Sequence, residues 1–453
     1  RKLLDPIIEH MMEAVHRYEG TVNQVMGDGI MALFGAPLAH EDHAVRACYA
    51  ALRMQESVKR YAEHVQKTEG IPIQIRVGLN SGEVVVRSIG SDLKLDYTAV
   101  GQTTHLAARM EQMAMPGSIL MSPDTLRFAA GYVQAKVLGP VNVKGINEPI
   151  EVYEITHAGP VRSRLQAAAA RGPTPFVGRT AEFDRLCQAL DQAKAGHGQV
   201  VALVGEPGVG KSRLIWEFIH YRSTADWLIL ESASVSYGKA TAYLPVIDLL
   251  KAYFSIDDGD EVRKIREKVT GKLLALDKSF DSTLPAFLAL LDVTVDPSAD
   301  SGQAQWQSLD PSQRRQRTLD AVKRLLLRES QAQPLVLVFE DLHWIDTQTQ
   351  SLLDSLIESL PTARILLLVN YRPEYRHGWG SKSYFSQLRI DPLQAESADE
   401  LLQALLGNDA NLKTLKQLLI ERTEGNPFFL EESVCGLIET KVLAGERGNY
   451  HLQ

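Results

Sequence analysis

The segment that most constrains this chain is a glycine-rich run of eight residues, Gly205-Glu-Pro-Gly-Val-Gly-Lys-Ser212. The residues before it, Gln199–Val204, form the apolar run of a buried strand, and those from Ser212 onward have the spacing of an amphipathic helix. Between a strand and a helix, such glycines let consecutive backbone N–H groups point into one concavity, where the helix N-terminus adds positive potential. The run therefore predicts a phosphate-binding loop for a nucleoside triphosphate, ATP with Mg²⁺.

Each residue type in this loop has an expected task. Gly205, Gly208 and Gly210 allow the backbone to approach the phosphates closely. Lys211 is expected to reach the β- and γ-phosphates, and the hydroxyl of Ser212 is expected to ligate Mg²⁺. The full motif in this context is much more specific than an ordinary glycine-rich turn.

Two later strands add polar residues to the same predicted edge. Leu335–Phe339 has the pattern of a buried strand and is followed by Glu340 and Asp341. Carboxylates at the carboxyl end of a neighbouring strand are placed to hold Mg²⁺, directly or through water. The strand Arg364–Asn370 is followed by Arg372, for which two interpretations stay open: a sensor of the γ-phosphate or an exposed loop charge.

Length and charge restrict the remaining possibilities. The chain has 453 residues, 45% of them hydrophobic, and a net charge of -8. The length predicts two or three domains, and the acidic balance gives no support to nucleic-acid binding. The sequence contains no apolar run of membrane-spanning length, so no membrane partner is expected. Three widely spaced cysteines, Cys48, Cys187 and Cys435, indicate a reducing, cytoplasmic setting.

Composition shifts predict the domain organisation. Residues 1–156 alternate helical and strand patterns, and 157–174 has the turn formers of a linker. In 175–392, strands alternate with amphipathic helices, which predicts a parallel α/β sheet. We expect 393–453 to be a helical, winged-helix-like region, and 257–316 to be a helical insertion with an exposed loop around Asp292–Asp310.

The second of these domains resembles a known family. The motifs that carry the resemblance are Phe176-Val-Gly-Arg179, the phosphate loop, Glu340-Asp-Leu-His-Trp-Ile-Asp346, Tyr371-Arg372 and Gly425-Asn-Pro-Phe-Phe429. Together they look like the signal-transduction ATPases of the STAND group, within the AAA-type clan. The resemblance implies that Lys211 and Ser212 bind phosphate and Mg²⁺, that Glu340 and Asp341 form the acidic motif, and that Arg372 is the strand-end sensor. It also implies that Pro427 lies near the adenine, and that protein partners bind repeats beyond the sequence given.

The first domain begins with two strands joined by a tight turn. Thr21–Met26 and Ile30–Phe34 flank Gly27-Asp28-Gly29, and an Asp-Gly pair is a hairpin signal in its own right. By itself, Asp28 is therefore explained by turn chemistry.

The wider context resembles the class III nucleotidyl cyclases, the adenylate and guanylate cyclases. The resemblance covers nearly all of residues 1–156 and rests on Val25-Met-Gly-Asp-Gly-Ile-Met-Ala-Leu-Phe34, Arg76-Val-Gly-Leu-Asn-Ser-Gly-Glu-Val84, Asp96-Tyr-Thr-Ala-Val-Gly101, Ala107-Ala-Arg109 and Asn142-Val-Lys-Gly145. It implies a ferredoxin-like α+β fold that works as a homodimer, with ATP and Mg²⁺ or Mn²⁺. It further implies that Asp28 binds metal, Arg109 stabilises the transition state, Lys144 contacts the phosphates and Thr98 recognises the purine.

Three features depart from this family pattern. Gln24 stands where the family has a purine-selecting lysine, and His105 stands where it has a ribose-orienting asparagine. The first metal aspartate is absent; since helical spacing is already present at Leu3, we expect the sequence to begin inside a domain. Neutral His and Gln can still donate hydrogen bonds, so one interpretation is an active, retuned bacterial signalling cyclase regulated by the ATPase. The other is an inactive domain that serves for dimerisation or nucleotide sensing.

Other suggestive residues have plainer explanations. His40 and His43 match no standard metal-ligand spacing, and Arg314-Arg-Gln-Arg317 has the pattern of a solvated helix face. Trp344 and Trp379 are expected to be packing residues. A DNA-acting ATPase is disfavoured because the sequence has an acidic balance and no recognisable DNA-binding motif.

Overall fold

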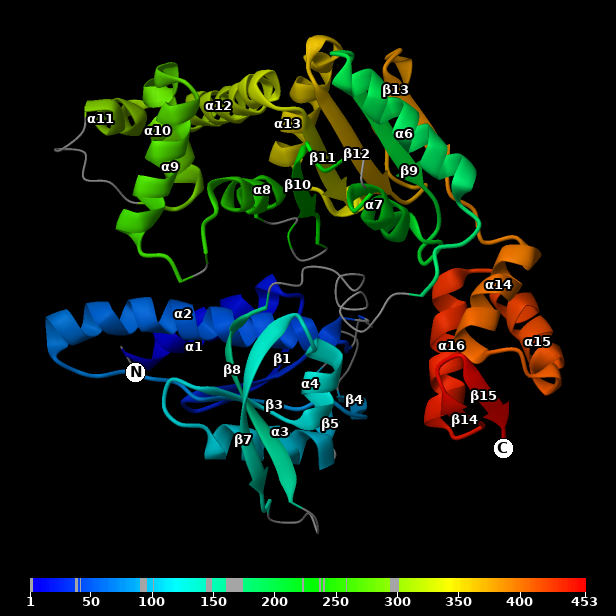
Figure 1. Cartoon of the computed structure of the whole chain (residues 1–453). Helices are drawn as coiled ribbons and strands as arrows, with labels where there is room; N and C mark the ends of the chain where they lie inside the picture. Colours follow the sequence, from blue (N-terminus) through cyan, green and yellow to red (C-terminus); the bar gives the residue numbers. More distant parts are fainter. Residues whose placement is uncertain are drawn as a thin grey trace. The chain divides into compact units, whose positions relative to one another are not determined.

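The computed structural model describes residues 3–36, 40, 42–89, 96–100, 102–143, 149–159, 174–221, 224–235, 238, 241–257, 259–293 and 301–453, with only the backbone for 85–89 and 96–100. The chain divides into two compact units, Arg1–Gly172 and Pro173–Gln453 (Figure 1). Most of the predicted linker, residues 160–173, lies outside the described residues.

The first unit is an α+β fold. Its elements are α1 (Leu4–Arg17), β1 (Thr21–Met26), β2 (Gly29–Leu33), α2 (His43–Glu69), β3 (Val77–Leu79), β4 (Val85–Ile89), β5 (Asp96–Val100), α3 (Gln102–Met113), β6 (Ile119–Met121), α4 (Pro123–Ala129), β7 (Val133–Val141) and β8 (Ile150–Ala158). A four-stranded sheet has the order β3-β6-β8-β7, in which only the β3–β6 pair is parallel. Antiparallel hairpins join β1 to β2 and β4 to β5. The predicted α+β class is confirmed.

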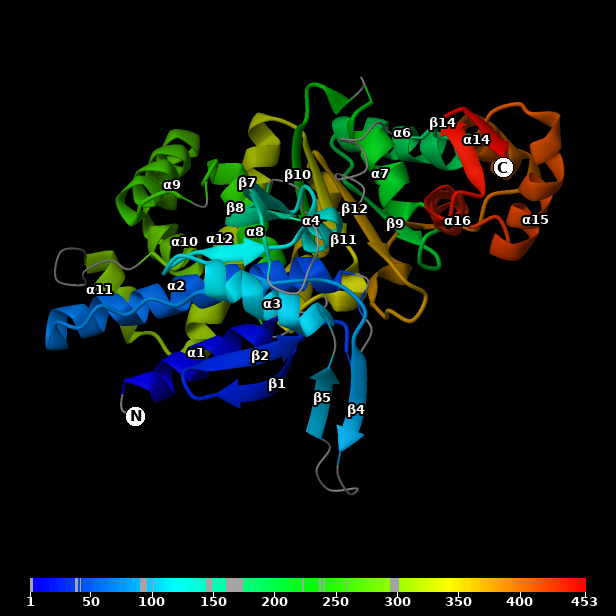
Figure 2. The ribbon, with the colours of Figure 1, turned by 90° about the horizontal axis from the view of Figure 1, so that it is seen from below.

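Helix α2 packs against both the elements around the first hairpin and the four-stranded sheet. Near its middle, Met54 and Val58 pack in one cluster with Met11 and Val15 of α1. Its earlier turns place Cys48 in a second cluster with residues of β6 and β8. Figure 2 shows α1 lying along the β1–β2 hairpin, which α1 contacts through both strands. This packing fixes the turn that carries Asp28 to the body of the unit.

The second unit is built on a parallel sheet. Its main elements are α6 (Thr180–Lys194), β9 (Gln199–Val204), α7 (Lys211–Ile219), β10 (Leu228–Ala233), α8 (Leu244–Phe254), α9 (Val262–Leu276), η3 (Lys278–Thr283), α10 (Leu284–Leu290), α11 (Ser301–Ser308), α12 (Pro311–Ala332), β11 (Leu335–Glu340), η4 (Leu342–Trp344), α13 (Thr347–Glu358), η5 (Leu360–Thr362), β12 (Ile365–Tyr371), η6 (Trp379–Ser381) and β13 (Phe385–Arg389). The strand order is β10-β11-β12-β9-β13, and every pair is parallel. The predicted parallel α/β sheet is confirmed.

Helices cover both faces of this sheet, which explains why its central strands are apolar throughout. On β9, Val201 and Leu203 face the cluster formed with α6 and α7, whereas Val200 and Ala202 face the cluster formed with α8, α12 and α13 (Figure 1). The insertion predicted around residues 257–316 is helical, but the expected exposed loop contains the helix α11.

A smaller region follows the sheet. It consists of α14 (Ala395–Leu406), η7 (Ala410–Leu412), α15 (Lys413–Thr423) and α16 (Pro427–Glu439), followed by a hairpin of β14 (Leu443–Glu446) and β15 (Asn449–Leu452). Leu402, Leu406, Leu412 and Leu430 form its buried core. This core also includes Val177, which lies before α6, so the region packs against the segment that enters the sheet.

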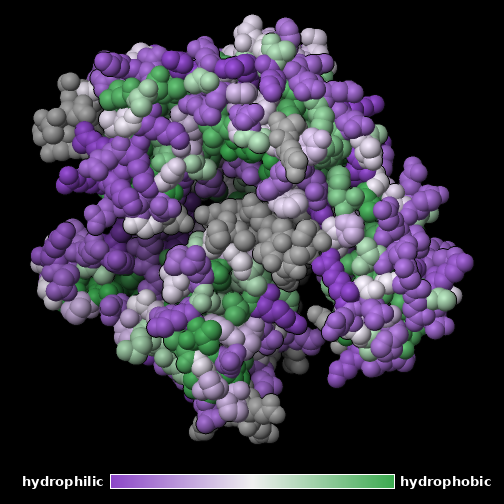
Figure 3. All heavy atoms as spheres, in the orientation of Figure 1, coloured by the Kyte–Doolittle hydropathy of each residue, from purple (hydrophilic) through white to green (hydrophobic). Residues whose placement is uncertain are grey.

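Hydrophilic side chains cover most of the surface seen in Figure 3, and hydrophobic ones gather in small areas between them. Among the described residues, no helix has the length and apolar character needed to cross a membrane.

Candidate functional site

The predicted phosphate loop connects β9 to α7, and its glycines are required by the backbone. Gly208 and Gly210 have φ angles of +81° and +98°, in the left-handed region that other residues rarely adopt. A Cβ on Gly205 would lie 2.3 Å from the carbonyl oxygen of Ile390, which follows β13. The loop is therefore tightly wrapped against the carboxyl end of the sheet.

Lys211 is buried inside this loop, with 7% of the residue exposed. Its Nζ donates hydrogen bonds to the carbonyl oxygens of Gly205 and Glu206, at 2.8 and 2.9 Å. Burial lowers the pKa of Lys211, and the Asp341 carboxylate acts in the opposite direction. A lysine held by the backbone of a glycine-rich loop is suited to binding phosphate.

The two acidic residues meet the loop at the end of β11. Burial raises the pKa of Glu340 to about 7, although hydrogen bonds from Ser212 and Asn370 lower it. Burial also raises the pKa of Asp341, against the effects of Lys211 and Arg372. A carboxyl group with a pKa near neutrality can take up or release a proton under ordinary conditions.

Asn370, on β12, connects these two acids and was missed by the sequence analysis. Its Nδ2 donates to Oε2 of Glu340 at 2.8 Å, and its Oδ1 accepts the backbone N–H of Asp341 at 2.8 Å. Asn370 is completely buried. The signal that would have found it is a polar residue near the carboxyl end of an otherwise apolar strand, Ile365–Tyr371.

Arg372 lies at the same edge, directly after β12. Its guanidinium lies over the ring of Trp344, 6.0 Å from the ring centroid, and it influences the pKa of both Lys211 and Asp341. Trp344 was expected to serve in packing, and here it also contacts Arg372. The structure thus brings the predicted Lys211, Ser212, Glu340, Asp341 and Arg372 to one edge of the sheet.

The region after the sheet also touches the loop. Asn426 Nδ2 donates to the carbonyl oxygen of Pro207 at 2.9 Å, and the N–H of Phe428 donates to that of Gly208 at 3.3 Å. Between them, Pro427 is the nearest neighbour of a Cβ placed on Gly210, at 3.9 Å. Pro427 therefore lies beside the phosphate loop.

The donors at this edge fit a hard cation such as Mg²⁺. They are oxygen atoms, a hydroxyl on Ser212 and a carboxylate on Asp341, and Mg²⁺ commonly takes one or two protein ligands together with phosphate and water oxygens. Within the described parts of the chain, no cluster of three or more His, Cys, Asp or Glu side chains is arranged for a metal.

The first unit places its candidate residues on several separate elements. Gln24 on β1 and Asp28 in the β1–β2 turn are exposed, and His105 and Arg109 lie on α3. Arg109 Nη1 donates to Oε1 of Gln112 at 2.6 Å. Among the described residues, no hydrogen bond or ion pair joins Asp28 to Arg109.

Helix α3 is fixed by a close approach to β3. A Cβ on Gly78 would lie 2.1 Å from the backbone nitrogen of Glu111 and 2.4 Å from the carbonyl oxygen of Ala107. Thr98 is placed on β5 by its backbone, in register with Arg87 of β4. Lys144 lies outside the described residues.

Two family models match this chain, one for each unit. Residues 1–157 match the adenylate and guanylate cyclase catalytic domain, and residues 175–369 match an AAA ATPase domain. The chain joins a cyclase-family domain to an AAA-family domain. The resemblances to class III cyclases and to AAA-type ATPases are confirmed.

Individual relatives match one or both domains of this chain. An uncharacterised protein of Rhizobium meliloti is 26% identical over 434 residues, which are 95% of this chain and 41% of that protein. Adenylate cyclase 1 of the same organism is 32% identical over 156 residues, 34% of this chain and 23% of that protein. The chain thus spans less than half of either relative.

Solved cyclase structures are similar to the cyclase-family domain. The adenylyl cyclase CyaB from P. aeruginosa is 27% identical, with a TM-score of 0.33, covering 34% of this chain and 81% of that one. The guanylyl cyclase Cya2 is 31% identical, with a TM-score of 0.33, covering 36% of this chain and 82% of that one.

Proposed function

We propose that this chain belongs to a cytoplasmic, bacterial signalling protein with two nucleotide sites. Its cyclase-family domain converts ATP to cyclic AMP and diphosphate, and its AAA-family domain binds and hydrolyses ATP as a regulatory switch. The observation that carries the proposal is the meeting of Lys211, Glu340 and Asn370 around a phosphate loop, in the same chain as a cyclase-family domain.

In the AAA-family domain, the loop binds the triphosphate. Its backbone N–H groups and Lys211 neutralise the phosphate charge, and Ser212 and Asp341 hold Mg²⁺. When bound, Mg²⁺ offsets negative charge on the phosphates. Arg372, whose guanidinium lies over the Trp344 ring and acts on the pKa of Asp341, adds a second cation at this edge of the sheet.

Glu340 serves as the general base for hydrolysis. Its carboxylate accepts a proton from the attacking water, and its raised pKa of about 7 makes this transfer more favourable than for an ordinary glutamate. Asn370 acts through Glu340 as a positioning residue, because its amide donates to Oε2 of that carboxylate. Loss of either residue should slow hydrolysis more than it weakens binding.

In the cyclase-family domain, the ribose 3′-hydroxyl gives up its proton to solvent and its oxygen forms a bond to the α-phosphorus, while the bond to the departing diphosphate breaks. Asp28 holds one of two Mg²⁺ or Mn²⁺ ions, and Arg109 stabilises the negative charge that develops at the α-phosphate. Gln24 and Thr98 contact the purine. His105 orients the ribose, and Lys144 contacts the phosphates.

Two subunits complete each cyclase site. Asp28 and Arg109 lie on different elements of one unit without a contact among the described residues, which agrees with a homodimer in which each acts opposite its counterpart. In the STAND-type switch, Pro427 contacts the adenine, so a change of bound nucleotide can move the helical region that contains α16. Repeats elsewhere in the full protein bind protein partners.

The deciding experiment measures cyclic nucleotide formation by the full-length protein with ATP and Mn²⁺, in the wild type and in Asp28→Ala and Arg109→Ala. We expect product from the wild type and a large loss in both variants. A full-length dimer that makes no product from ATP or GTP would instead support the inactive, nucleotide-sensing domain.

A further inference from the structure

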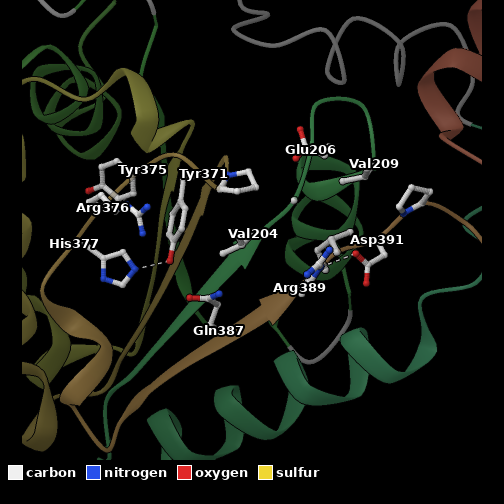
Figure 4. Close-up of a pocket in the computed structure, with 14 residues that line it drawn as sticks. Val204, Glu206, Val209, Tyr371, Tyr375, Arg376, His377, Gln387, Arg389 and Asp391 are labelled. Carbon is white, nitrogen blue, oxygen red and sulfur yellow. Dashed lines mark hydrogen bonds and ion pairs between the residues drawn. The ribbon is translucent and has the colours of Figure 1, made fainter. Parts of the chain in front are cut away.

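A cavity of about 530 Å³ lies beside the phosphate loop, at the carboxyl ends of β9, β12 and β13 (Figure 4). Gly205, Glu206 and Val209 of the loop line one side of it, and the segment after β12 lines the other. Among the described residues that line it, neither Lys211 nor Ser212 is present. The volume lies within the range of small-ligand pockets, so the cavity is a separate candidate site.

The connection from β12 to β13 contains no long helix that could cover the sheet beside the cavity. Parallel strands are usually joined by a helix that covers the sheet, but residues 372–384 contain only the three-residue η6. On β13, Leu388 points into the buried cluster with α6, and Gln387 and Arg389 remain exposed on the other face. The exposed face of β13 and the carboxyl end of β9 at Val204 therefore border the cavity.

The end of β12 and the segment after it supply a hydrogen-bond donor to the cavity. His377 Nε2 lies 2.5 Å from the hydroxyl oxygen of Tyr371, and His377 Nδ1 accepts the backbone N–H of Trp379 at 3.2 Å. Burial lowers the pKa of His377, against the effect of Asp354, so the ring is neutral and its one hydrogen is on Nε2. That hydrogen is donated to Tyr371, and the Tyr371 O–H, whose pKa is raised to about 12, keeps its own hydrogen for another acceptor.

The same segment also supplies a cation, Arg376, and aromatic rings. Arg376 is exposed, and among the described residues no carboxylate forms an ion pair with it, whereas Arg389 is paired with Asp391 at 2.8 Å. The rings of Tyr371 and Tyr375 lie 4.9 Å apart between their centroids and, in Figure 4, stand beside Arg376 and His377. A free guanidinium, a hydroxyl donor and aromatic rings suit a ligand with an anionic group and a flat ring.

We propose that this cavity binds a mononucleotide, with its phosphate on Arg376 and the Tyr371 hydroxyl and its base against the half-buried Tyr375 ring. The site is distinct from the ATP site at Lys211 and does not depend on the activity proposed for either domain. Because the occupant would contact Gly205, Glu206 and Val209, its binding would be coupled to the conformation of the phosphate loop.

Isothermal titration calorimetry of the full chain with AMP tests this proposal. Arg376→Gln should weaken the binding of AMP at one site by about tenfold, the effect of losing one charge-assisted contact. Arg185→Gln, which removes an exposed arginine of α6, should have no effect. Lys211→Met should leave this binding in place, because Lys211 does not line the cavity.

Two further probes define the ligand. Tyr371→Phe keeps the ring and removes the hydroxyl, so it should weaken AMP binding without abolishing it. If cyclic AMP competes with AMP, the product of the proposed cyclase is identified as an occupant; if cyclic AMP does not compete, the occupant is a nucleoside monophosphate. Both results support the mononucleotide class. The proposal is overturned by AMP binding that survives Arg376→Gln and Tyr371→Phe, by its loss in Lys211→Met, or by inorganic phosphate that binds as tightly as AMP.

Discussion

The amide of Asn370 joins β12 to β11: it donates to Oε2 of Glu340 at 2.8 Å and accepts the backbone N–H of Asp341 at the same distance. One buried side chain therefore sets the positions of both acidic residues at the phosphate loop. Because the two strands are parallel neighbours, their carboxyl ends meet at this edge, where ligands bind in open α/β sheets.

Replacement of Asn370 by leucine should separate hydrolysis from binding. The change removes both hydrogen bonds and leaves the buried N–H of Asp341 without its acceptor, which should cost about 1–3 kcal/mol in the free energy of unfolding. ATP hydrolysis should fall more than ATP affinity, because Lys211 and the loop are unchanged. Urea unfolding measures the free energy of unfolding, calorimetry measures the ATP affinity, and phosphate release measures the rate of hydrolysis. The same change at the exposed Asn411 is the control, and equal losses of binding and hydrolysis in the Asn370 variant would count against the positioning role.

Replacement of Glu340 by glutamine should abolish the proton transfer and keep the nucleotide bound. We expect hydrolysis to fall by about 100-fold or more, the usual contribution of a general base. In the wild type, kcat/KM should rise as the pH increases through about 7, because the carboxylate is the active form and burial keeps Glu340 protonated below that pH. A wild-type profile without this rise, or one that the glutamine variant retains, would exclude Glu340 as the base.

The raised pKa of the Glu340 carboxyl group should also make the stability of the protein depend on pH. The pKa of Glu340 is raised from 4.5 to about 7 in the folded protein, so between these values the folded state holds a proton that the unfolded state has released. The free energy of unfolding therefore decreases as the pH rises from about 4.5 to about 7, and this contribution is absent from Glu340→Gln. Urea unfolding of both proteins across this range measures the difference, which should favour the variant increasingly toward pH 7. A difference that stays constant with pH would contradict the raised pKa.

Replacement of Gly78 by alanine should disturb the cyclase-family domain alone. The new Cβ would meet the backbone of Glu111 and Ala107 at 2.1 and 2.4 Å, so α3, which carries Arg109, must shift. We expect a loss of about 1–3 kcal/mol in the stability of this domain and reduced cyclic AMP formation, with ATP binding at the phosphate loop unchanged. Gly29→Ala is the control for stability, because a Cβ there meets no atom within 4 Å. Unchanged thermal unfolding of Gly78→Ala would show that the close approach does not constrain α3.

The sequence predicted those features that depend on local patterns. The phosphate loop follows from eight consecutive residues and their flanking strand and helix, and Glu340, Asp341 and Arg372 were found because each follows the end of an apolar strand. Parallel strands then bring these ends together, so the cluster was predictable without the structure.

The features that the sequence did not reveal depend on contacts between distant segments. Asn370 looked like an ordinary strand-end residue until the pairing of β11 with β12 placed it against Glu340. Trp344 looked like a packing residue because nothing local indicates that Arg372 lies over its ring. The cavity beside Tyr371 lies where the connection between β12 and β13 has no covering helix, and its place next to the phosphate loop depends on the pairing of β13 with β9.

The central claim is that nucleotide binding at Lys211 regulates the cyclase. The most direct test compares cyclic AMP formation by the full-length wild type and Lys211→Met, with the cyclase substrate saturating. Lys211→Met should weaken ATP binding at the phosphate loop by about 100-fold, since it removes a buried charged donor, and it should change the cyclase rate by severalfold. A variant that has lost ATP binding at the loop and still makes cyclic AMP at the wild-type rate would contradict the account.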